Sequence, residues 1–343
     1  MRKLLNTLYV TTPESYISKD GENIVISLNN KEIFRIPVHN IEGIVTFGYM
    51  GISPGAMQLC CQRNVGVSLL TPNGKFVSRI SGEVRGNVLL RRTQYRWADD
   101  TQKSNQLSQL FIAGKIANSR SVIERFKREN QTEKDKSILI RISEELKRKK
   151  NYCFHTTNNN DLRGIEGESA MLYFSVFDDM ILHQKKDFIF SGRNRRPPKD
   201  KVNALLSFCY TLLAHDVQSA LETVGLDPYV GFLHVDRPGR VSLALDMMEE
   251  LRAYLCDRFV LSLINRKQIS GTGFIEHADN GVIMDNNTRK TILTAWQKRK
   301  QETITHPYLK EEIPLGLLPY VQAMLLARYM RNDLDNYPVF LIL

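Results

Sequence analysis

Short apolar and alternating runs fill roughly the first eighty positions of the chain. SYISKDGENIVISL holds two β-prone runs around Asp20 and Gly21, a strong hairpin signal. KEIFRIPV, IEGIVTFG, VGVSLL and FVSRIS predict further strands, with a tight turn at TPNGK before the last one. PGAMQLCCQRN predicts one short helix, with Pro54 near its start. The pattern indicates a β-sandwich-like N-terminal domain, residues 1–82.

The pattern changes after Gly82. Gly82 and Gly86 bracket a predicted linker, residues 83–90. Apolar residues then recur at helical spacing, and the expected helices span residues 101–128, 133–149, 162–180, 201–224, 242–265 and 313–331. Asn160 or Asp161 would cap the third helix, and Ser242 the fifth. The expected fold is α+β, with a mostly α-helical C-terminal domain over residues 91–343.

Composition and charge narrow the class of protein. A chain of 343 residues suits two domains. No apolar stretch is long enough for a membrane helix, and five cysteines without a CxxC pair indicate reduced thiols in a cytoplasmic protein. The net charge is +10, and residues 87–150 alone hold sixteen Lys/Arg against eight Asp/Glu. This central segment is either a phosphate-contact surface or a solvated helix face.

Several carboxylates crowd the predicted helix 242–265. Asp246, Glu249, Glu250 and Asp257 share one side of it, because residues three and four apart are neighbours on a helix. A solvated acidic face with local salt bridges is the simplest explanation. The alternative is a metal ion, because His234 ends the apolar run YVGFLH shortly before the helix begins.

The residue types favour a hard or borderline divalent ion. One imidazole and two carboxylates suit Mn²⁺ or Mg²⁺, whereas Zn²⁺ is less favoured without a nearby cysteine or second histidine. Glu166 stands between Gly164 and Gly167, and these small residues are expected to let another helix approach closely. An acid at such a contact is costly unless it is paired or bound to a cation. Glu166, His234 and Glu249 could therefore share one ion, although spacing alone leaves open whether their segments meet.

These segments carry a family resemblance. RGIEGESAMLYF, the basic loop FSGRNRRPPKD, the helix VNALLSF, the junction GLDPYVGFLH and the helix DMMEELR occur in the order found in the CRISPR-associated adaptation endonuclease and integrase, the Cas-one family. The resemblance extends over nearly the whole chain. Its last forty or so residues resemble the C subtype of type I systems.

The resemblance implies a catalytic Mg²⁺ or Mn²⁺ site at Glu166, His234 and Glu249. Asp246 would bind the metal or hold a ligand in place. It also implies a homodimer through the N-terminal domains, with two such dimers bridged by a dimer of the small Cas-two partner. The implied substrate is double-stranded DNA, whose fragments are joined into a CRISPR array by transesterification without a covalent protein intermediate.

DNA contacts are expected from arginines in two places. Arg237, Arg240 and Arg252 would lie near the metal, and the residues of the central basic segment lie further out: Arg91, Arg92 and Arg96. Tyr95 and Trp97 could stack on nucleic acid or pack against the next helix. Two other functions remain open, namely a non-catalytic DNA-binding scaffold with a structural metal site and a metal-dependent RNA-processing enzyme. No RNP-type aromatic motif supports the second of these.

Overall fold

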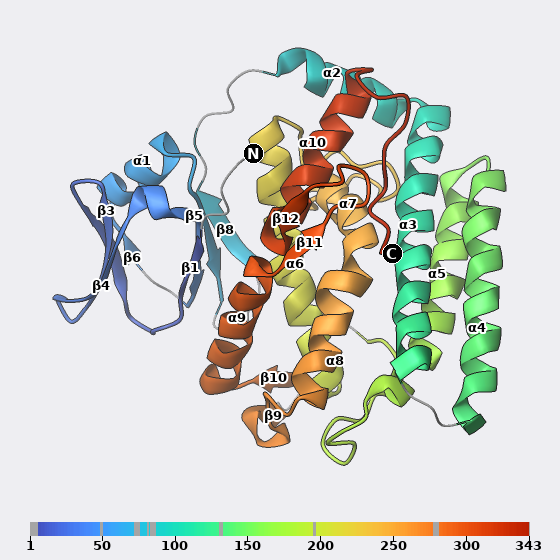
Figure 1. Ribbon diagram of the computed structural model, residues 1–343. Coiled ribbons are helices and arrows are strands. Elements are labelled where there is room, and N and C mark those ends of the chain that lie inside the picture. The colour runs from blue at the N-terminus through green and yellow to red at the C-terminus, as the bar shows by residue number, and fades with distance from the viewer. Residues whose placement is uncertain are drawn as a thin grey trace. The chain divides into compact units, whose positions relative to one another are not determined.

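A computed structural model describes residues 6–48, 51–71, 76–80, 82, 87–129, 133–194, 197–276 and 281–342 (Figure 1). The chain forms two compact units. The first comprises Met1–Arg85, Ile283–Glu302 and Pro314–Gly316, and the second Gly86–Val282, Thr303–Ile313 and Leu317–Leu343. Val88–Leu90, which the sequence placed in a linker, belong to the first turn of helix α2.

The first unit is built from two four-stranded sheets. One has the order β1-β5-β7-β8, with β1, β5 and β7 parallel and β8 antiparallel to β7. The other has the order β4-β3-β2-β6. The strands are β1 (Asn6–Val10), β2 (Tyr16–Asp20), β3 (Asn23–Leu28), β4 (Lys31–Pro37), β5 (Ile41–Phe47), β6 (Gly51–Ile52), β7 (Gly66–Leu70) and β8 (Phe76–Ile80).

The predicted hairpin and short helix are both present. β2 and β3 pair around Gly21, whose φ of 57° suits a tight turn. Helix α1 (Pro54–Gln62) starts at a proline and is capped by Ser53, whose side chain accepts a hydrogen bond from the Ala56 N–H. The predicted turn at TPNGK lies mostly outside the described residues.

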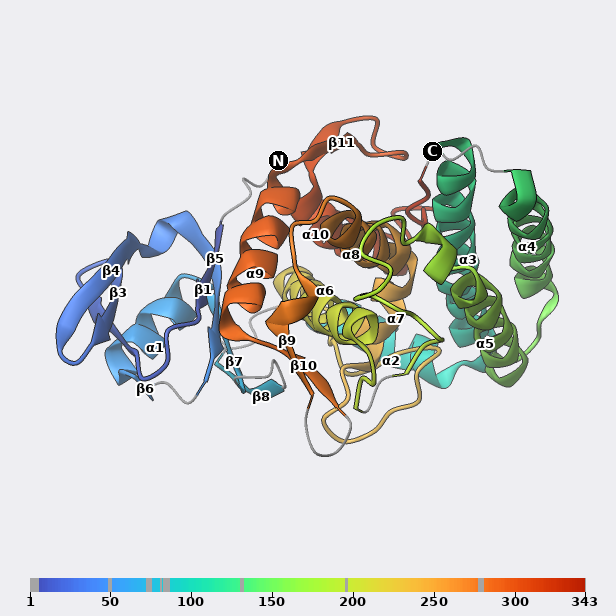
Figure 2. The same cartoon turned by 90° about the horizontal axis from the view of Figure 1, so that it is seen from below.

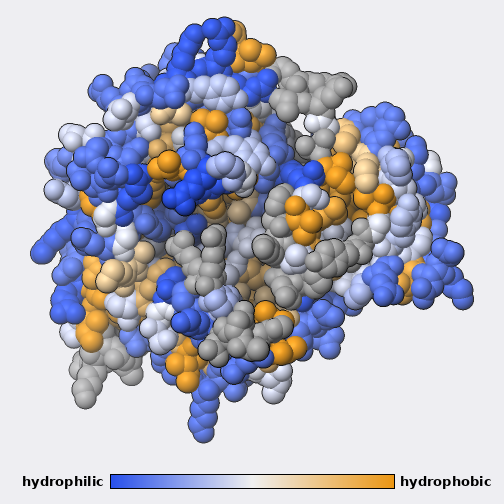
Figure 3. All heavy atoms as spheres, turned by 180° about the vertical axis from the view of Figure 1, so that it is seen from behind, coloured by the Kyte–Doolittle hydropathy of each residue, from blue (hydrophilic) through white to orange (hydrophobic). Residues whose placement is uncertain are grey.

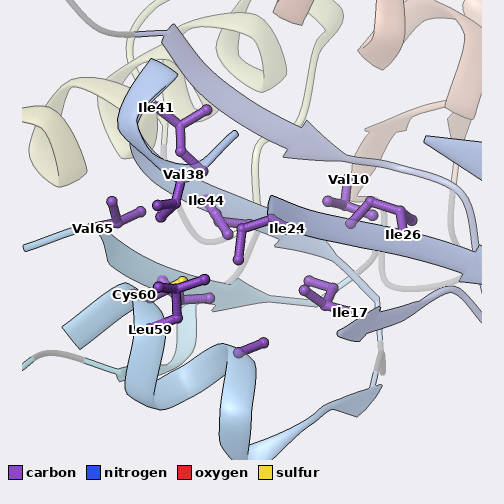
Figure 4. Packing of buried hydrophobic residues seen from close by; sticks show 12 residues of the cluster. Val10, Ile17, Ile24, Ile26, Val38, Ile41, Ile44, Leu59, Cys60 and Val65 are labelled. Atoms are coloured by element: carbon purple, nitrogen blue, oxygen red, sulfur yellow. The ribbon is translucent and has the colours of Figure 1, made fainter. Parts of the chain in front are cut away.

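Buried aliphatic side chains from both sheets and from α1 form one core (Figure 4). Ile17 and Ile24 come from one sheet, Ile44 from the other, and Leu59 and Cys60 from the helix. Burial of this apolar surface is the main force that holds the sheets together. The predicted N-terminal strands and, with the helices described below, the α+β class are therefore confirmed.

Helix α9 (Asn286–Gln301) also belongs to the first unit and contacts β1. The sequence pattern does not predict this helix. Its apolar stripe is short, since Ile292, Leu293 and Trp296 share the buried positions with polar side chains. One of these is Lys300, whose Nζ lies 3.4 Å from Thr7 Oγ1. Polar groups that find partners inside the fold interrupt the periodicity on which the prediction relied.

The second unit is mainly helical. In both cartoon views α3, α4 and α5 run side by side, and α3 contacts α4, α5 and α7 (Figure 2). The helices are α2 (Val88–Asp99), α3 (Thr101–Glu129), α4 (Glu133–Tyr152), α5 (Asn159–Ser175), α6 (Lys201–Val224), α7 (Ser242–Arg252), α8 (Arg258–Asn265) and α10 (Leu318–Met330). Short strands β9 (Phe274–Glu276), β10 (Val282–Met284), β11 (Thr303–Thr305) and β12 (Glu312–Pro314) complete the fold.

Helix α2 was not among the expected helices, and the boundaries of the others differ most at three places. α5 begins earlier and ends at Ser175, and its cap is Asn158, whose side chain accepts from the N–H groups of residues 160 and 161. The predicted helix 242–265 is interrupted by a π-helical turn, Ala253–Asp257, and Ser242 is its first residue, not its cap. Residues 312–314 are a strand, so α10 starts five residues later than expected.

Among the described residues no helix has the length and apolar character that crossing a bilayer requires. Hydrophilic side chains cover most of the face in Figure 3, with hydrophobic ones scattered among them.

Candidate functional site

The four acids of the α7 region are buried. Asp246 and Glu250 are 0% exposed, Asp257 2% and Glu249 3%. The solvated acidic face considered from the sequence is therefore wrong. A buried carboxylate needs hydrogen bonds or a positive partner, and each of these four finds a different one.

Asp246 holds the loop that carries His234. Its Oδ2 accepts hydrogen bonds from the backbone N–H groups of Phe232 and Leu233 at 2.6 and 3.0 Å, and its Oδ1 accepts from the His234 N–H at 3.0 Å. The same Oδ1 lies 2.5 Å from His234 Nδ1. Because an ionised carboxylate only accepts, Nδ1 carries the proton and Nε2 is left to bind a cation.

Gly231 makes this close approach of loop and helix feasible. A Cβ at this position would lie 2.7 Å from Ser242 Cβ and 2.9 Å from Asp246 Oδ2, closer than real Cβ atoms come. The absence of a side chain therefore lets the backbone of residues 231–234 reach the first turn of α7. The prediction that His234 lies against the start of the acidic helix is confirmed.

Two neighbouring helices hold the other side of the loop. The Phe232 carbonyl accepts hydrogen bonds from Ser104 Oγ of α3 at 3.1 Å and from Asn159 Nδ2 of α5 at 2.9 Å. Arg163 Nη1 of α5 donates to the Leu233 carbonyl at 2.8 Å. Arg163 stands three residues before Glu166, so the helix that binds the loop also presents Glu166 about one turn further on.

Glu166 and Glu249 share one basic partner. The ammonium of Lys115, on α3, forms ion pairs with Glu166 Oε1 and with Glu249 Oε2, the second at 2.8 Å. Two carboxylates from separate helices, α5 and α7, thus meet at a single nitrogen. Sequence spacing left this convergence open. Lys115 was not predicted, although a lone lysine in the apolar stretch FIAGKIAN is an available signal.

Glu249 is strongly biased toward its charged form. Burial alone would raise the pKa of Glu249, but the positive charges of Arg252 and Lys115 outweigh it, and the pKa is lowered to about 2. Arg252 Nη1 lies 2.8 Å from Glu249 Oε1. An acid that is ionised at any physiological pH is suited to bind a cation.

The donor set fits a divalent ion, but the described residues do not form a finished cage for one. Among them no three His, Cys, Asp or Glu side chains are arranged to hold a metal. Glu249 Oε2 is nevertheless buried, and its partner among them is the Lys115 ammonium, 2.8 Å away. A buried carboxylate oxygen paired with a cation beside a second carboxylate suits the oxygen preference of Mg²⁺ and Mn²⁺.

The glycines beside Glu166 have another role than the predicted one. A Cβ at Gly164 or Gly167 would meet no atom within 4 Å, so these residues do not mark a tight helix contact. Gly167 instead lines a cavity of about 470 Å³ next to the paired carboxylates. The cavity wall also includes Lys115, Ser169, Arg193, Tyr210 and Arg252.

The arginines predicted to contact DNA lie in different settings. Arg252 has its partners inside the fold, because its side chain is only 13% exposed and pairs with Glu249. Its guanidinium carbon also lies 5.0 Å from the centroid of the Tyr210 ring. On α2, Trp97 packs edge-on against Tyr329 of α10 and Tyr95 donates to Asp227, so both side chains have partners within the fold. The remaining arginines are exposed (Arg92, Arg96 and Arg237) or half-buried (Arg91 and Arg240).

The remaining two acids, Glu250 and Asp257, hold parts of the fold together. Glu250 accepts hydrogen bonds from the Tyr337 hydroxyl, the Gln322 amide and the Phe340 N–H. Burial raises the pKa of Glu250 to about 7, although these three bonds act in the opposite direction. Asp257 accepts from the Tyr210 hydroxyl at 2.6 Å. Glu250 thus anchors the C-terminal segment to α7, and Asp257 anchors α6 to the π-helical turn.

Comparisons with known proteins agree with the resemblance found in the motifs. The model of the family described as CRISPR associated protein Cas1 matches residues 8–298. The CRISPR-associated endonuclease Cas1 1 of Chlorobaculum tepidum is 50% identical over 340 residues, which are 99% of each chain. A casposase bound to integration product has a TM-score of 0.83 at 23% identity, covering 98% of this chain and 93% of that one.

A chain of a Cas6-RT-Cas1–Cas2 complex has a TM-score of 0.84 at 21% identity, and the match covers 100% of this chain and 37% of that chain. At such identities the two solved structures show a shared fold. The family match over most of the length, together with a curated relative half identical from end to end, shows that the chain belongs to the CRISPR-associated Cas1 family.

Proposed function

We propose that this protein is a metal-dependent DNA endonuclease and integrase that joins double-stranded DNA fragments into a CRISPR array by transesterification. The observation that carries the proposal is that Glu166 of α5 and Glu249 of α7 both pair with the Lys115 ammonium. The same two helices also hold the His234 loop, through Arg163 and Asp246. The names of the curated relatives and the casposase fold support nuclease and integrase chemistry.

Glu166, Glu249 and Nε2 of His234 would hold the divalent ion, Mg²⁺ or Mn²⁺. When bound, the ion would polarise the scissile phosphate and stabilise charge on the leaving oxygen. Asp246 is a positioning residue in this scheme, because all four of its hydrogen bonds are made with residues 232–234 of the His234 loop. Arg252 keeps Glu249 ionised and fixed in orientation.

The attacking group in strand joining would be the 3′-hydroxyl of the incoming DNA. No protein nucleophile is required, because transesterification exchanges one phosphodiester bond for another. Exposed arginines, among them Arg92, Arg96 and Arg237, would hold the DNA backbone and supply much of the affinity.

The proposed assembly contains a second copy of this chain and the small Cas2 partner. The solved Cas1–Cas2 complex with the same fold supports this partnership. The expected arrangement is two homodimers, each formed through the N-terminal domain, bridged by a Cas2 dimer. The likeness of the C-terminal segment to the C subtype stays a prediction.

Strand joining tests the proposal. A short DNA duplex with free 3′-hydroxyls, a plasmid carrying a leader and repeat, Cas2 and Mg²⁺ or Mn²⁺ would be incubated with wild-type protein and with Glu166→Ala, His234→Ala and Glu249→Ala. Each variant should lose joining by roughly a hundredfold or more while DNA retention stays near that of the wild type.

Glu168→Ala is the matched control. Glu168 lies on the same helix as Glu166, is exposed and pairs with Lys149 outside the site. It should join DNA normally. Unaltered joining by the three site variants would instead favour a non-catalytic DNA-binding scaffold with a structural metal site.

A further inference from the structure

Lys115 stands where the two candidate ligand carboxylates meet. It projects from α3, its side chain is 12% exposed, and its ammonium contacts Glu166 and Glu249 together. A buried ammonium without such partners would be strongly destabilised, and so would two neighbouring carboxylates without a cation. The three groups therefore stabilise one another in the metal-free protein.

An ammonium and a divalent ion cannot occupy this place together. Lys115 Nζ lies 2.8 Å from Glu249 Oε2, whereas Mg²⁺ binds carboxylate oxygens at about 2.1 Å. A metal bound by both carboxylates would meet the ammonium at contact distance and repel it. Binding of the ion thus requires the lysine to withdraw.

The cavity beside the site gives the lysine room to withdraw. Lys115 lines this space of about 470 Å³, and its four-carbon stem is flexible. The wall includes Ser169, whose hydroxyl oxygen is buried without a hydrogen-bond partner among the described residues, and Asp257. Polar groups are therefore present to receive the ammonium.

We propose that Lys115 is an internal counter-ion that keeps Glu166 and Glu249 together in the metal-free protein and that the divalent ion must displace. Lys115 consequently sets the metal affinity of the site. This inference rests on the proposed function, because it takes the two carboxylates to be metal ligands. It adds a positioning residue that competes with the ion and does not itself bind it.

Mn²⁺ binding measured by electron paramagnetic resonance tests the competition directly, without reference to activity. Titrations would compare the wild type with Lys115→Met and with the milder Lys115→Gln, whose folding is checked by circular dichroism. Removing the competing charge should tighten Mn²⁺ binding by roughly tenfold. In EDTA the same variants should melt several degrees lower, about 3 °C or more, and Mn²⁺ should raise their Tm further than that of the wild type.

Lys149→Met is the control. Lys149 pairs with the single carboxylate of Glu168, also on α5, and the Glu168 side chain is 67% exposed. Its loss should leave Mn²⁺ affinity unchanged, which excludes a general effect of removing one positive charge.

Folded Lys115 variants that bind Mn²⁺ as the wild type does, or more weakly, would overturn the counter-ion role. Glu249→Gln separates this result from a failure of the proposed function. If Glu249→Gln abolishes Mn²⁺ binding while the Lys115 variants leave it unchanged, only the counter-ion role is wrong. If the wild type binds no Mn²⁺, the metal site and the counter-ion role are both wrong.

Discussion

At the scale of single residues, the partner of each acid decides its role. The four acids of the α7 region look alike in the sequence, but each has a different partner. Asp246 accepts from backbone amides and Glu249 pairs with basic side chains. Glu250 accepts from Tyr337 in the C-terminal segment, and Asp257 accepts from Tyr210 of α6. The first three lie within little more than one helical turn. Their mutual repulsion is offset separately at each position, and burial shifts Glu250 toward its neutral form by raising its pKa to about 7.

Asp246→Asn should weaken function without removing a metal ligand. The amide would turn an N–H₂ group toward backbone N–H donors or toward His234, so at least one hydrogen bond is lost and the imidazole is no longer fixed. We expect Mn²⁺ affinity and joining to fall by roughly ten- to a hundredfold, and the free energy of unfolding to fall by about 1–3 kcal/mol. Unchanged Mn²⁺ affinity in the folded variant would contradict the positioning role.

Glu250 should make stability depend on pH. Its pKa is about 7 in the folded protein against an ordinary value of 4.5, so between these values the folded chain binds more protons and stability falls as pH rises. Glu250→Gln is neutral throughout. From pH 5 to pH 8 the wild type should lose up to about 3 kcal/mol relative to this variant, measured by urea unfolding. A pH-independent difference would be inconsistent with the raised pKa.

The site could be predicted from the sequence only in part, for a physical reason. Glu166, His234 and Glu249 were identified by residue type and by the family motifs. Lys115 and Arg163 were missed because their roles depend on contacts with segments far away in the chain. Periodicity describes one element at a time, and it cannot show which elements pack together.

At the scale of elements, α5 links the parts of the site. One helix presents Glu166, holds the Leu233 carbonyl through Arg163 and reaches the Phe232 carbonyl through Asn159. Strong apolar stripes made α3 and α6 predictable nearly to the residue, whereas α9 buries polar side chains and was missed. The helix 242–265 was predicted in extent, but its π-helical turn has no periodic signal.

Arg163→Met should loosen the His234 loop while keeping apolar contacts of the stem. The Leu233 carbonyl would lose its donor, and we expect joining to fall about tenfold with a Tm change of only a few degrees. Joining assays combined with melting curves measure both effects. Arg163→Lys, which restores a donor, should recover part of the activity. Wild-type joining by the Met variant would show that this bond does not position His234.

At the scale of the whole molecule, positive charge is concentrated in the central segment, residues 87–150, which forms α2, α3 and α4. Part of this charge is used internally, as Lys115 shows. Arg92 and Arg96 on α2 remain exposed. The choice between a phosphate-contact surface and a solvated face therefore concerns the exposed residues of this segment, such as Arg92 and Arg96, and not Lys115.

The double variant Arg92→Ala/Arg96→Ala tests the phosphate-contact role. It should weaken DNA binding for any sequence and reduce the slope of log K against log salt by up to about 1.8, or roughly 0.9 for each lost phosphate contact. Fluorescence anisotropy at several salt concentrations gives the slope. Arg63→Ala, which removes a residue paired with Glu22 in the first unit, should leave it unchanged. An unchanged slope in the double variant would assign these arginines to a solvated face.

The most direct test of the proposed metal centre is anomalous scattering from crystals soaked in Mn²⁺. We predict one strong peak within bonding distance, about 2.2 Å, of Glu166, Glu249 and Nε2 of His234, with the Lys115 ammonium withdrawn from both carboxylates. A peak elsewhere, or none at saturating Mn²⁺ with Lys115 still between the two acids, would contradict the account.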